Sequence, residues 1–148
     1  MDLPLASRRL ILGGGLFALT LGPARATPDS LRAAMRDFAG AVVPRPGRVR
    51  LEMPTLVENG NAVPTTVIVD SPMTAEDHVV EIALFNERNP LPDIARFTLG
   101  PRCGQAWVST RIRLGDTQSV HALARMNDGA IWSASAELIV TLPACIEG

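Results

Sequence analysis

The 148-residue sequence has few of the residue types on which most catalytic and metal sites are built. It contains two histidines and two cysteines, and it has no lysine and no tyrosine. No His-x-His or Cys-x-x-Cys pair is present from which a metal site could start. His78 and His121 are therefore expected to be ordinary strand residues, and no metal or cofactor is expected.

The recurring motifs of enzymes are also missing. The sequence has no Gly-x-Ser-x-Gly nucleophile elbow and no nucleotide-binding glycine loop, since Gly13–Gly15 belongs to a leader segment. Its carboxylates are scattered along turns and solvent faces, so no acid and base pair stands out. We therefore expect a protein that is not an enzyme.

The charge balance argues against nucleic acid as a partner. Fourteen arginines face 15 acidic residues, and the net charge is −1. A nucleic-acid-binding domain would carry a clear excess of basic residues.

Residues 1–26 have the features of an export signal. Ser7–Arg9 is a twin-arginine pattern, Leu12–Leu21 is an apolar run, and Ala24–Ala26 is a small-x-small cleavage site. The apolar run is too short to span a bilayer. We expect a twin-arginine signal peptide that is removed, rather than a retained interfacial anchor. The protein is thus expected in a bacterial periplasm, without membrane anchoring.

Residues 27–47 predict one short helix followed by a connector. Thr27 is a suitable N-cap, Pro28 suits the first helical position, and Gly40 stands where a helix would stop. Four apolar residues follow at helical spacing: Leu31, Ala34, Met35 and Phe38. The proline-rich segment 43–47 is expected to be a short, stiff connector.

From residue 48 to residue 141, apolar residues alternate with a period of two, as in half-buried strands. Strands are expected at 49–53, 65–69, 78–85, 94–99, 106–114, 119–126 and 131–141. Turn residues divide them, and no internal repeat or second domain is present. The pattern predicts a mainly β fold, an immunoglobulin-like antiparallel β-sandwich of about seven strands preceded by one short helix.

Cys145 lies in residues 142–148, beyond the last expected strand. We expect these residues to form a flexible arm, which spans about 13 Å from Thr141 to Cys145 when fully extended. A thiol so placed can reach a partner's active site, where its thiolate form reacts. The two cysteines of an exported domain also fit one structural disulfide, here between Cys103 and Cys145. Otherwise Cys103 is a small buried filler, a bystander thiol or, if it is exposed, a thiol that links two copies of the chain.

Eight short segments of the sequence resemble those of a known protein family. They are Pro54–Gly60, Ala62–Pro64, Ser71–Met73, Asn89–Pro90, Ala95–Phe97, Thr110–Leu114, Gln118–Val120 and Asp128–Gly129. In their order and spacing they resemble the SoxY family, the thiosulfate oxidation carrier proteins of the periplasmic sulfur-oxidising system. The resemblance covers about residues 51–145 and includes the twin-arginine leader.

The resemblance implies a non-enzymatic carrier whose covalent substrate attachment site is Cys145. It also implies a complex with a SoxZ-like subunit, as a heterodimer or heterotetramer. In the family, the haem-containing SoxAX conjugates thiosulfate oxidatively to the thiol, and the manganese hydrolase SoxB releases sulfate. The molybdenum and haem protein SoxCD then oxidises the remaining sulfane sulfur.

The arm departs from the family pattern Gly-Gly-Cys-Gly-Gly. Pro143 and Ala144 precede the cysteine, and Ile146 and Glu147 follow it. Proline stiffens the arm, isoleucine adds bulk, and glutamate repels an anionic substrate. Two alternatives therefore stand beside the carrier: a diverged SoxY-like binding or complex-forming module without substrate carriage, and an exported β-sandwich with a structural disulfide.

Overall fold

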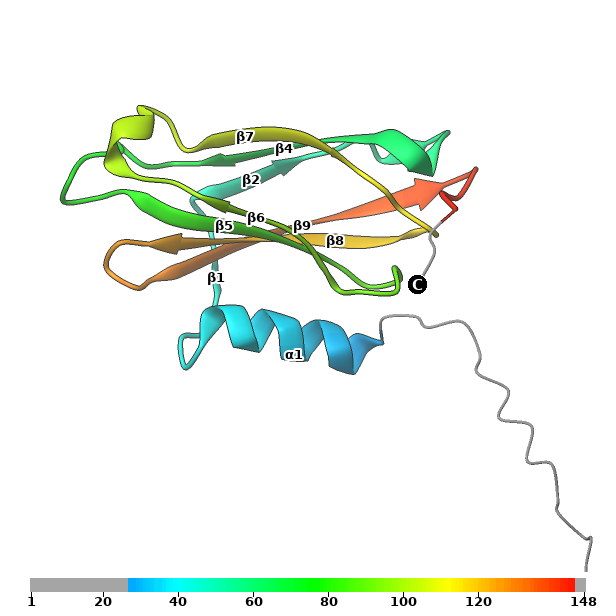
Figure 1. Ribbon diagram of the computed structural model, residues 1–148, viewed down its shortest axis with the longest axis horizontal. Helices are drawn as coiled ribbons and strands as arrows, with labels where there is room; N and C mark the ends of the chain where they lie inside the picture. The colour runs from blue at the N-terminus through cyan, green and yellow to red at the C-terminus, as the bar shows by residue number, and fades with distance from the viewer. Residues whose placement is uncertain (1–26, 146–148) are drawn as a thin grey trace, which may run out of the picture.

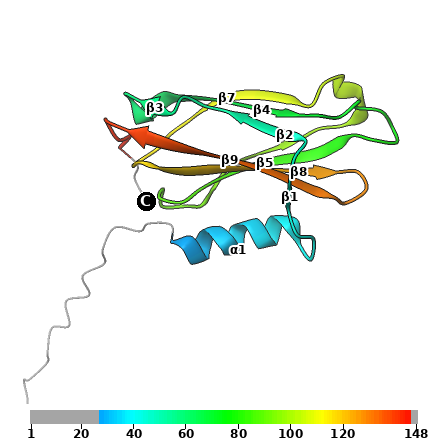
Figure 2. The same ribbon diagram turned by 180° about the vertical axis from the view of Figure 1, so that it is seen from behind.

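The computed structural model describes residues 27–145 of the chain. The expected signal peptide, residues 1–26, and residues 146–148 of the arm lie outside the described residues. The fold has three layers, a smaller sheet, a larger sheet and one helix on the outer face of the larger sheet (Figures 1 and 2). No helix among residues 27–145 is long and apolar enough to cross a membrane.

Helix α1 (Pro28–Ala39) begins and ends where its sequence signals place it. The Ser30 amide donates to the Thr27 hydroxyl at 3.2 Å, and the Thr27 amide donates to the Ser30 hydroxyl at 2.7 Å. This reciprocal cap satisfies amides that the first helical turn leaves free. Gly40, with a φ of 65°, ends the helix. The predicted helix is confirmed.

The buried side of α1 packs on the larger sheet. Phe38 is 1% exposed, and its ring lies edge to face with that of Phe85 at a centroid separation of 6.0 Å. The Arg125 guanidinium lies over the Phe38 ring at 4.7 Å and also donates to the Phe38 carbonyl. The helix thus has a hydrophobic core of its own beside the main one.

Nine strands form two sheets within the described residues. They are β1 (Arg45–Pro46), β2 (Val49–Glu52), β3 (Leu56–Val57), β4 (Val63–Val69), β5 (Val79–Asn86), β6 (Asp93–Thr98), β7 (Trp107–Ile112), β8 (Gln118–Met126) and β9 (Ile131–Val140). The larger sheet has the order β1-β9-β8-β5-β6, with β3 also paired to β9, and the smaller sheet has the order β2-β4-β7.

The seven predicted strands are all present, with ends displaced by no more than about two residues. The sandwich is not purely antiparallel, however, because β1 and β3 pair in parallel with β9. Each has two residues. In β1 the supposed connector joins the larger sheet, and the Arg45 guanidinium lies 4.7 Å from the centre of the Trp132 ring.

The main core lies between the two sheets. Alternate residues of β4 point into it, so Val63 and Val67 are fully buried, and β5 contributes Ile82 and Leu84 in the same way. Leu114, beyond the end of β7, is also fully buried. The core therefore extends to the end of the sandwich where the chain leaves β9.

Candidate functional site at the C-terminal arm

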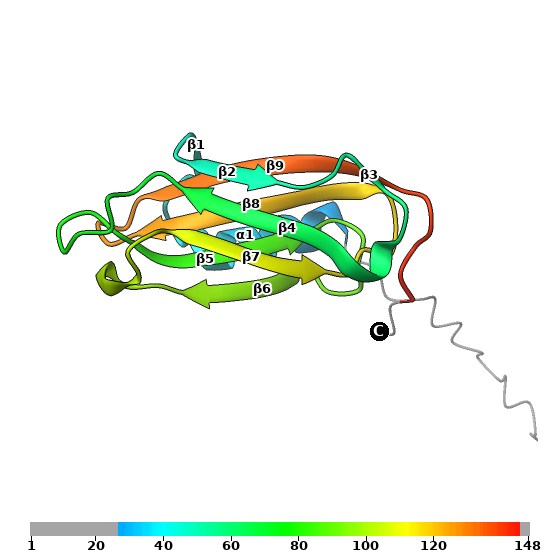
Figure 3. The ribbon, with the colours of Figure 1, turned by 90° about the horizontal axis from the view of Figure 1, so that it is seen from above.

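Strand β9 ends at one end of the sandwich, and the arm that follows it lies beside the short helix η1 (Gly60–Ala62) (Figure 3). After β9 ends, the chain continues alongside β3. The Thr141 amide donates to the Val57 carbonyl at 2.9 Å, and the Thr141 hydroxyl lies 3.3 Å from the same oxygen. The residue directly before the arm is thus held by both its backbone and its side chain.

A cluster of three backbone hydrogen bonds, which we call the clamp, holds the next residues. The Gly60 amide donates to the Leu142 carbonyl at 2.8 Å, and the Leu114 amide donates to the Gly60 carbonyl at 2.8 Å. The Ala144 amide in turn donates to the Leu114 carbonyl at 3.0 Å. Ala144 is 7% exposed. The expectation of a flexible arm over residues 142–148 is therefore wrong for residues 142–144, which are held in place, while residues 146–148 lie outside the described residues.

Cys145 follows directly on this fixed segment. Its thiol is free, and the residue is exposed. The arrangement presents a thiol at one end of the sandwich from an ordered root. A side chain in this position is open to a macromolecular partner as well as to a small reagent.

The loop that receives the arm is itself held by two polar side chains. The Asn89 side-chain amide donates to the Arg113 carbonyl at 2.8 Å, and the Gly115 amide donates to the Asn89 Oδ1 atom at 3.1 Å. Gln118, which is 5% exposed, donates its Nε2 to the same Oδ1 atom at 3.1 Å. The Leu114 carbonyl, which accepts the hydrogen bond from the arm, therefore lies in a loop that side-chain hydrogen bonds hold in place.

Sequence reasoning did not assign a role to Gly60, Asn89 or Gln118. Each appeared only as part of a segment that carried the family resemblance. Four of those segments, Pro54–Gly60, Asn89–Pro90, Thr110–Leu114 and Gln118–Val120, meet at the end of the sandwich that carries the arm. All four segments lie at or next to the end of a strand, and this common feature of the sequence could have indicated the site.

Cys103 lies far from Cys145. It belongs to the short helix η2 (Pro101–Cys103), at the opposite end of the sandwich (Figures 1 and 3). Strand β7, roughly 17 Å long at about 3.3 Å per residue, separates η2 from Leu114, which holds the arm. A disulfide requires Cα atoms within about 7 Å.

Both cysteines are exposed free thiols. The structural-disulfide alternative is therefore wrong. Cys103 is also not a buried filler, because it is exposed. It stays predicted to be a bystander thiol or a thiol that links two copies of the chain.

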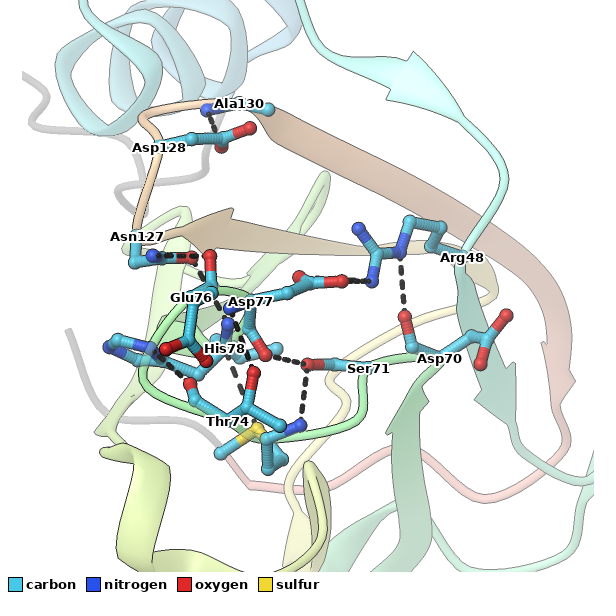
Figure 4. A network of polar contacts seen from close by, with 12 residues as sticks. Arg48, Asp70, Ser71, Thr74, Glu76, Asp77, His78, Asn127, Asp128 and Ala130 are labelled. Atoms are coloured by element: carbon cyan, nitrogen blue, oxygen red, sulfur yellow. Dashed lines mark hydrogen bonds and ion pairs between the residues drawn. The ribbon is translucent and has the colours of Figure 1, made fainter.

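The polar residues at the end opposite the arm tie loops together (Figure 4). The Arg48 guanidinium bonds the Asp77 carboxylate at 2.8 Å and the Asp70 carbonyl at 2.6 Å. The His78 amide donates to the Asn127 side chain at 3.0 Å, and the His78 Nδ1 atom lies 2.9 Å from the Thr74 carbonyl. These contacts close turns, so His78 has a structural place in the fold.

His121 points away from the main core, and its Nε2 atom lies 3.8 Å from the Glu87 carboxylate. Its neighbours Val120 and Ala122 face the core and are fully buried, as the strand alternation predicts. Among residues 27–145, no group of three or more His, Cys, Asp and Glu side chains could hold a metal ion.

The fold and the site define a helix-bearing β-sandwich that presents a free thiol at one end. A family model described as "Sulfur oxidation protein SoxY" matches residues 35–145. The chain belongs to the SoxY family, which confirms the resemblance found in its sequence. The match ends at Cys145.

Solved structures agree. The sulfur carrier protein SoxY from Chlorobium limicola f thiosulfatophilum is 26% identical, with a TM-score of 0.64, over 77% of this chain and 98% of that chain. The superoxide reductase (neelaredoxin) from Ignicoccus hospitalis is 21% identical, with a TM-score of 0.56, over 78% of this chain and 94% of that chain. The superoxide reductase from Nanoarchaeum equitans is 15% identical, with a TM-score of 0.55, over 65% of this chain and 100% of that chain.

At identities this low, the two superoxide reductases show a shared fold alone. No curated protein matches the chain.

Proposed function

We propose that this protein is a periplasmic carrier that holds thiosulfate-derived sulfur covalently on Cys145 and presents it to partner enzymes of sulfur oxidation. One observation carries the proposal: an exposed free thiol stands at the last residue of the SoxY family match, at one end of the sandwich. The similar protein from Chlorobium is described as a sulfur carrier protein. The chain itself is not an enzyme in this proposal, because its partners supply the chemistry.

Loading forms one S–S bond. The Cys145 sulfur joins the outer sulfur of thiosulfate to give a cysteine S-thiosulfonate, and the thiol proton is released. Two electrons leave in this step and pass, one at a time, to a haem-containing SoxAX-like partner. The role of this protein in the step is to expose the Cys145 thiol, whose thiolate form is the nucleophile.

Release of sulfate breaks the S–S bond between the sulfane sulfur and the sulfone. Water supplies the oxygen that turns the sulfone into sulfate, two protons are released, and a persulfide stays on Cys145. A SoxB-like hydrolase carries out this step, and a SoxCD-like enzyme oxidises the persulfide sulfur. The carrier retains the cargo between these steps because the bond to Cys145 is covalent.

The proposal includes a SoxZ-like subunit in a heterodimer or heterotetramer, and export by the twin-arginine pathway. The support for export is the leader pattern in residues 1–26. The support for the partner is the family to which the chain belongs.

Mass spectrometry tests carriage. The protein is purified from the periplasm of its own cells grown on thiosulfate, and its intact mass is measured with and without a reductant. We expect reductant-sensitive adducts of sulfur or of one S₂O₃ group, which peptide mapping places on Cys145. Cys145→Ser should lose them, and Cys103→Ser should keep them. An unmodified Cys145 thiol throughout would support the diverged module without substrate carriage instead.

A further inference from the structure

Gly60 stands where three segments of backbone meet, with no room for a side chain. A Cβ atom at this position would lie 2.3 Å from the Leu114 carbonyl oxygen, 2.9 Å from the Ala144 nitrogen and 3.2 Å from the Leu142 carbonyl oxygen. Each of these atoms takes part in a clamp hydrogen bond. The close approach of other backbone atoms is therefore what requires glycine here.

The clamp rests on a buried and hydrogen-bonded part of this end of the molecule. Leu114 is fully buried in the main core, and Asn89 bonds the residues on both sides of it. The atoms that a Gly60 side chain would meet are backbone atoms, which cannot rotate away as a side chain can. A substitution at Gly60 must therefore move the arm, the loop or both.

The departures of the arm from the glycine pattern of the family suit a fixed segment. Pro143 lies between Leu142 and Ala144, the two arm residues whose backbone atoms take part in the clamp. Pro143 is exposed, so it fills no space in the core. Proline restricts the backbone and lowers the entropy that ordering costs, and alanine in place of glycine acts in the same direction. Both residues favour a held arm over a mobile one.

We propose that Gly60 is a positioning residue for the substrate-bearing thiol. By allowing the clamp to form, it fixes the arm through Ala144, so that Cys145 is presented from a rigid root. The inference rests on the proposed function, in which Cys145 bears the cargo. The thiol then extends about one residue, on the order of 3.5 Å of backbone, past the fixed segment. Its partners must accept it close to the end of the sandwich, through a shallow entrance.

Gly60→Ala tests the clamp, and Gly100→Ala is its matched control. A Cβ atom at Gly100 would meet nothing within 4 Å, and the backbone there is extended, with a φ of −148°. Amide hydrogen exchange is measured by NMR on residues 27–148. We expect Ala144 to be protected in the wild type and in Gly100→Ala, and to exchange about tenfold faster in Gly60→Ala, since one hydrogen bond is lost.

A nitroxide on Cys145 in a Cys103→Ser background gives a second readout. Its electron paramagnetic resonance spectrum should show restricted motion in the wild type and fast motion in Gly60→Ala. If Gly60→Ala fails to fold, Ala144→Pro, which removes the amide that donates to Leu114, replaces it in the nitroxide measurement. An Ala144 amide that exchanges in the wild type as fast as in an unstructured peptide would overturn the inference.

Loading rates distinguish a positioning role of Gly60 from a purely structural one. Tetrathionate loads the thiol without a partner, because the thiolate attacks one of its inner sulfurs, an S–S bond forms and thiosulfate leaves. This rate should be the same in Gly60→Ala and the wild type. Loading from thiosulfate by the SoxAX-like haem protein of the same cells should fall about tenfold or more, because the thiol is no longer held in place. An equal fall in both rates, or in neither, would contradict a positioning role.

The two proposals fail separately. A wild-type protein that its haem partner never loads would refute the proposed function and the role of Gly60 in loading. A protein that is loaded normally while Gly60→Ala changes neither amide exchange nor partner-driven loading would refute the clamp alone.

Discussion

The side-chain amide of Gln118 donates a hydrogen bond to the Asn89 side-chain oxygen at 3.1 Å, and this pair holds the loop on which the arm lies. From Asn89 the bonds continue to Arg113 and Gly115, which flank Leu114. Leu114 then accepts the hydrogen bond of Ala144. The position of the residue before Cys145 is thereby coupled to a buried polar side chain in β8.

Asn89→Ala should lower the free energy of unfolding by about 1–2 kcal/mol, because the Gly115 amide and the Arg113 carbonyl lose their partner. The variant should also loosen the arm, so amide exchange at Ala144 should become faster. Urea denaturation and NMR check the two effects.

Asn61→Ala is the control for this substitution. Asn61 is exposed, and its side chain contacts only the neighbouring Asn59 among the described hydrogen bonds. Its unfolding free energy should stay within about 0.5 kcal/mol of the wild type. Equal effects of the two substitutions would show that the network around Asn89 does not support the arm.

Local signals in the sequence predicted most of the fold. Helix α1 was predicted because its cap, its proline and its terminal glycine are all local features. The seven longer strands were predicted because alternation along one strand reports its two faces. Strands β1 and β3 were missed, since two residues are too few for alternation and their pairing with β9 joins distant segments.

The site was predictable only in part for the same physical reason. Cys145 stands out by its position in the sequence alone. Gly60 lies in a segment that predicts a turn, and nothing local shows that its backbone meets Leu114 and Ala144 across the fold. The prediction of a mobile arm followed from the absence of a strand pattern after residue 141. Irregular backbone can still be fixed when distant segments supply its hydrogen bonds.

Phe38→Ala should lower the free energy of unfolding by about 3 kcal/mol, because it removes a fully buried ring between α1 and the larger sheet. Thermal unfolding followed by circular dichroism checks the loss. Arg32→Ala is the control on the same helix, since the Arg32 side chain is 66% exposed and pairs with an exposed Asp29. A similar stability for both variants would mean that α1 does not depend on its contact with the sheet.

Two free thiols should be found in the reduced, unloaded protein, and air oxidation should not join them within one chain. The short helix η2, which contains Cys103, lies at the end of the sandwich opposite the arm that carries Cys145, so the two thiols are too far apart for a disulfide. Alkylation followed by intact-mass measurement should show two additions per chain in the native protein. Cys103→Ser should show one addition and an unchanged unfolding midpoint. A two-proton mass deficit within a single chain would contradict the described fold.

Restoring glycines around the thiol should adapt this carrier to foreign partners. Ala144→Gly keeps the amide that bonds Leu114 but weakens the ordered arm by about 0.5–1 kcal/mol, since glycine loses more backbone entropy on ordering. Ile146→Gly removes β-branched bulk next to the thiol. The double variant should be loaded faster than the wild type by a SoxAX partner from a species whose SoxY ends in Gly-Gly-Cys-Gly-Gly. Loading by tetrathionate serves as the control and should not change. Equal partner-driven rates for the two proteins would mean that the shape of the arm does not limit loading.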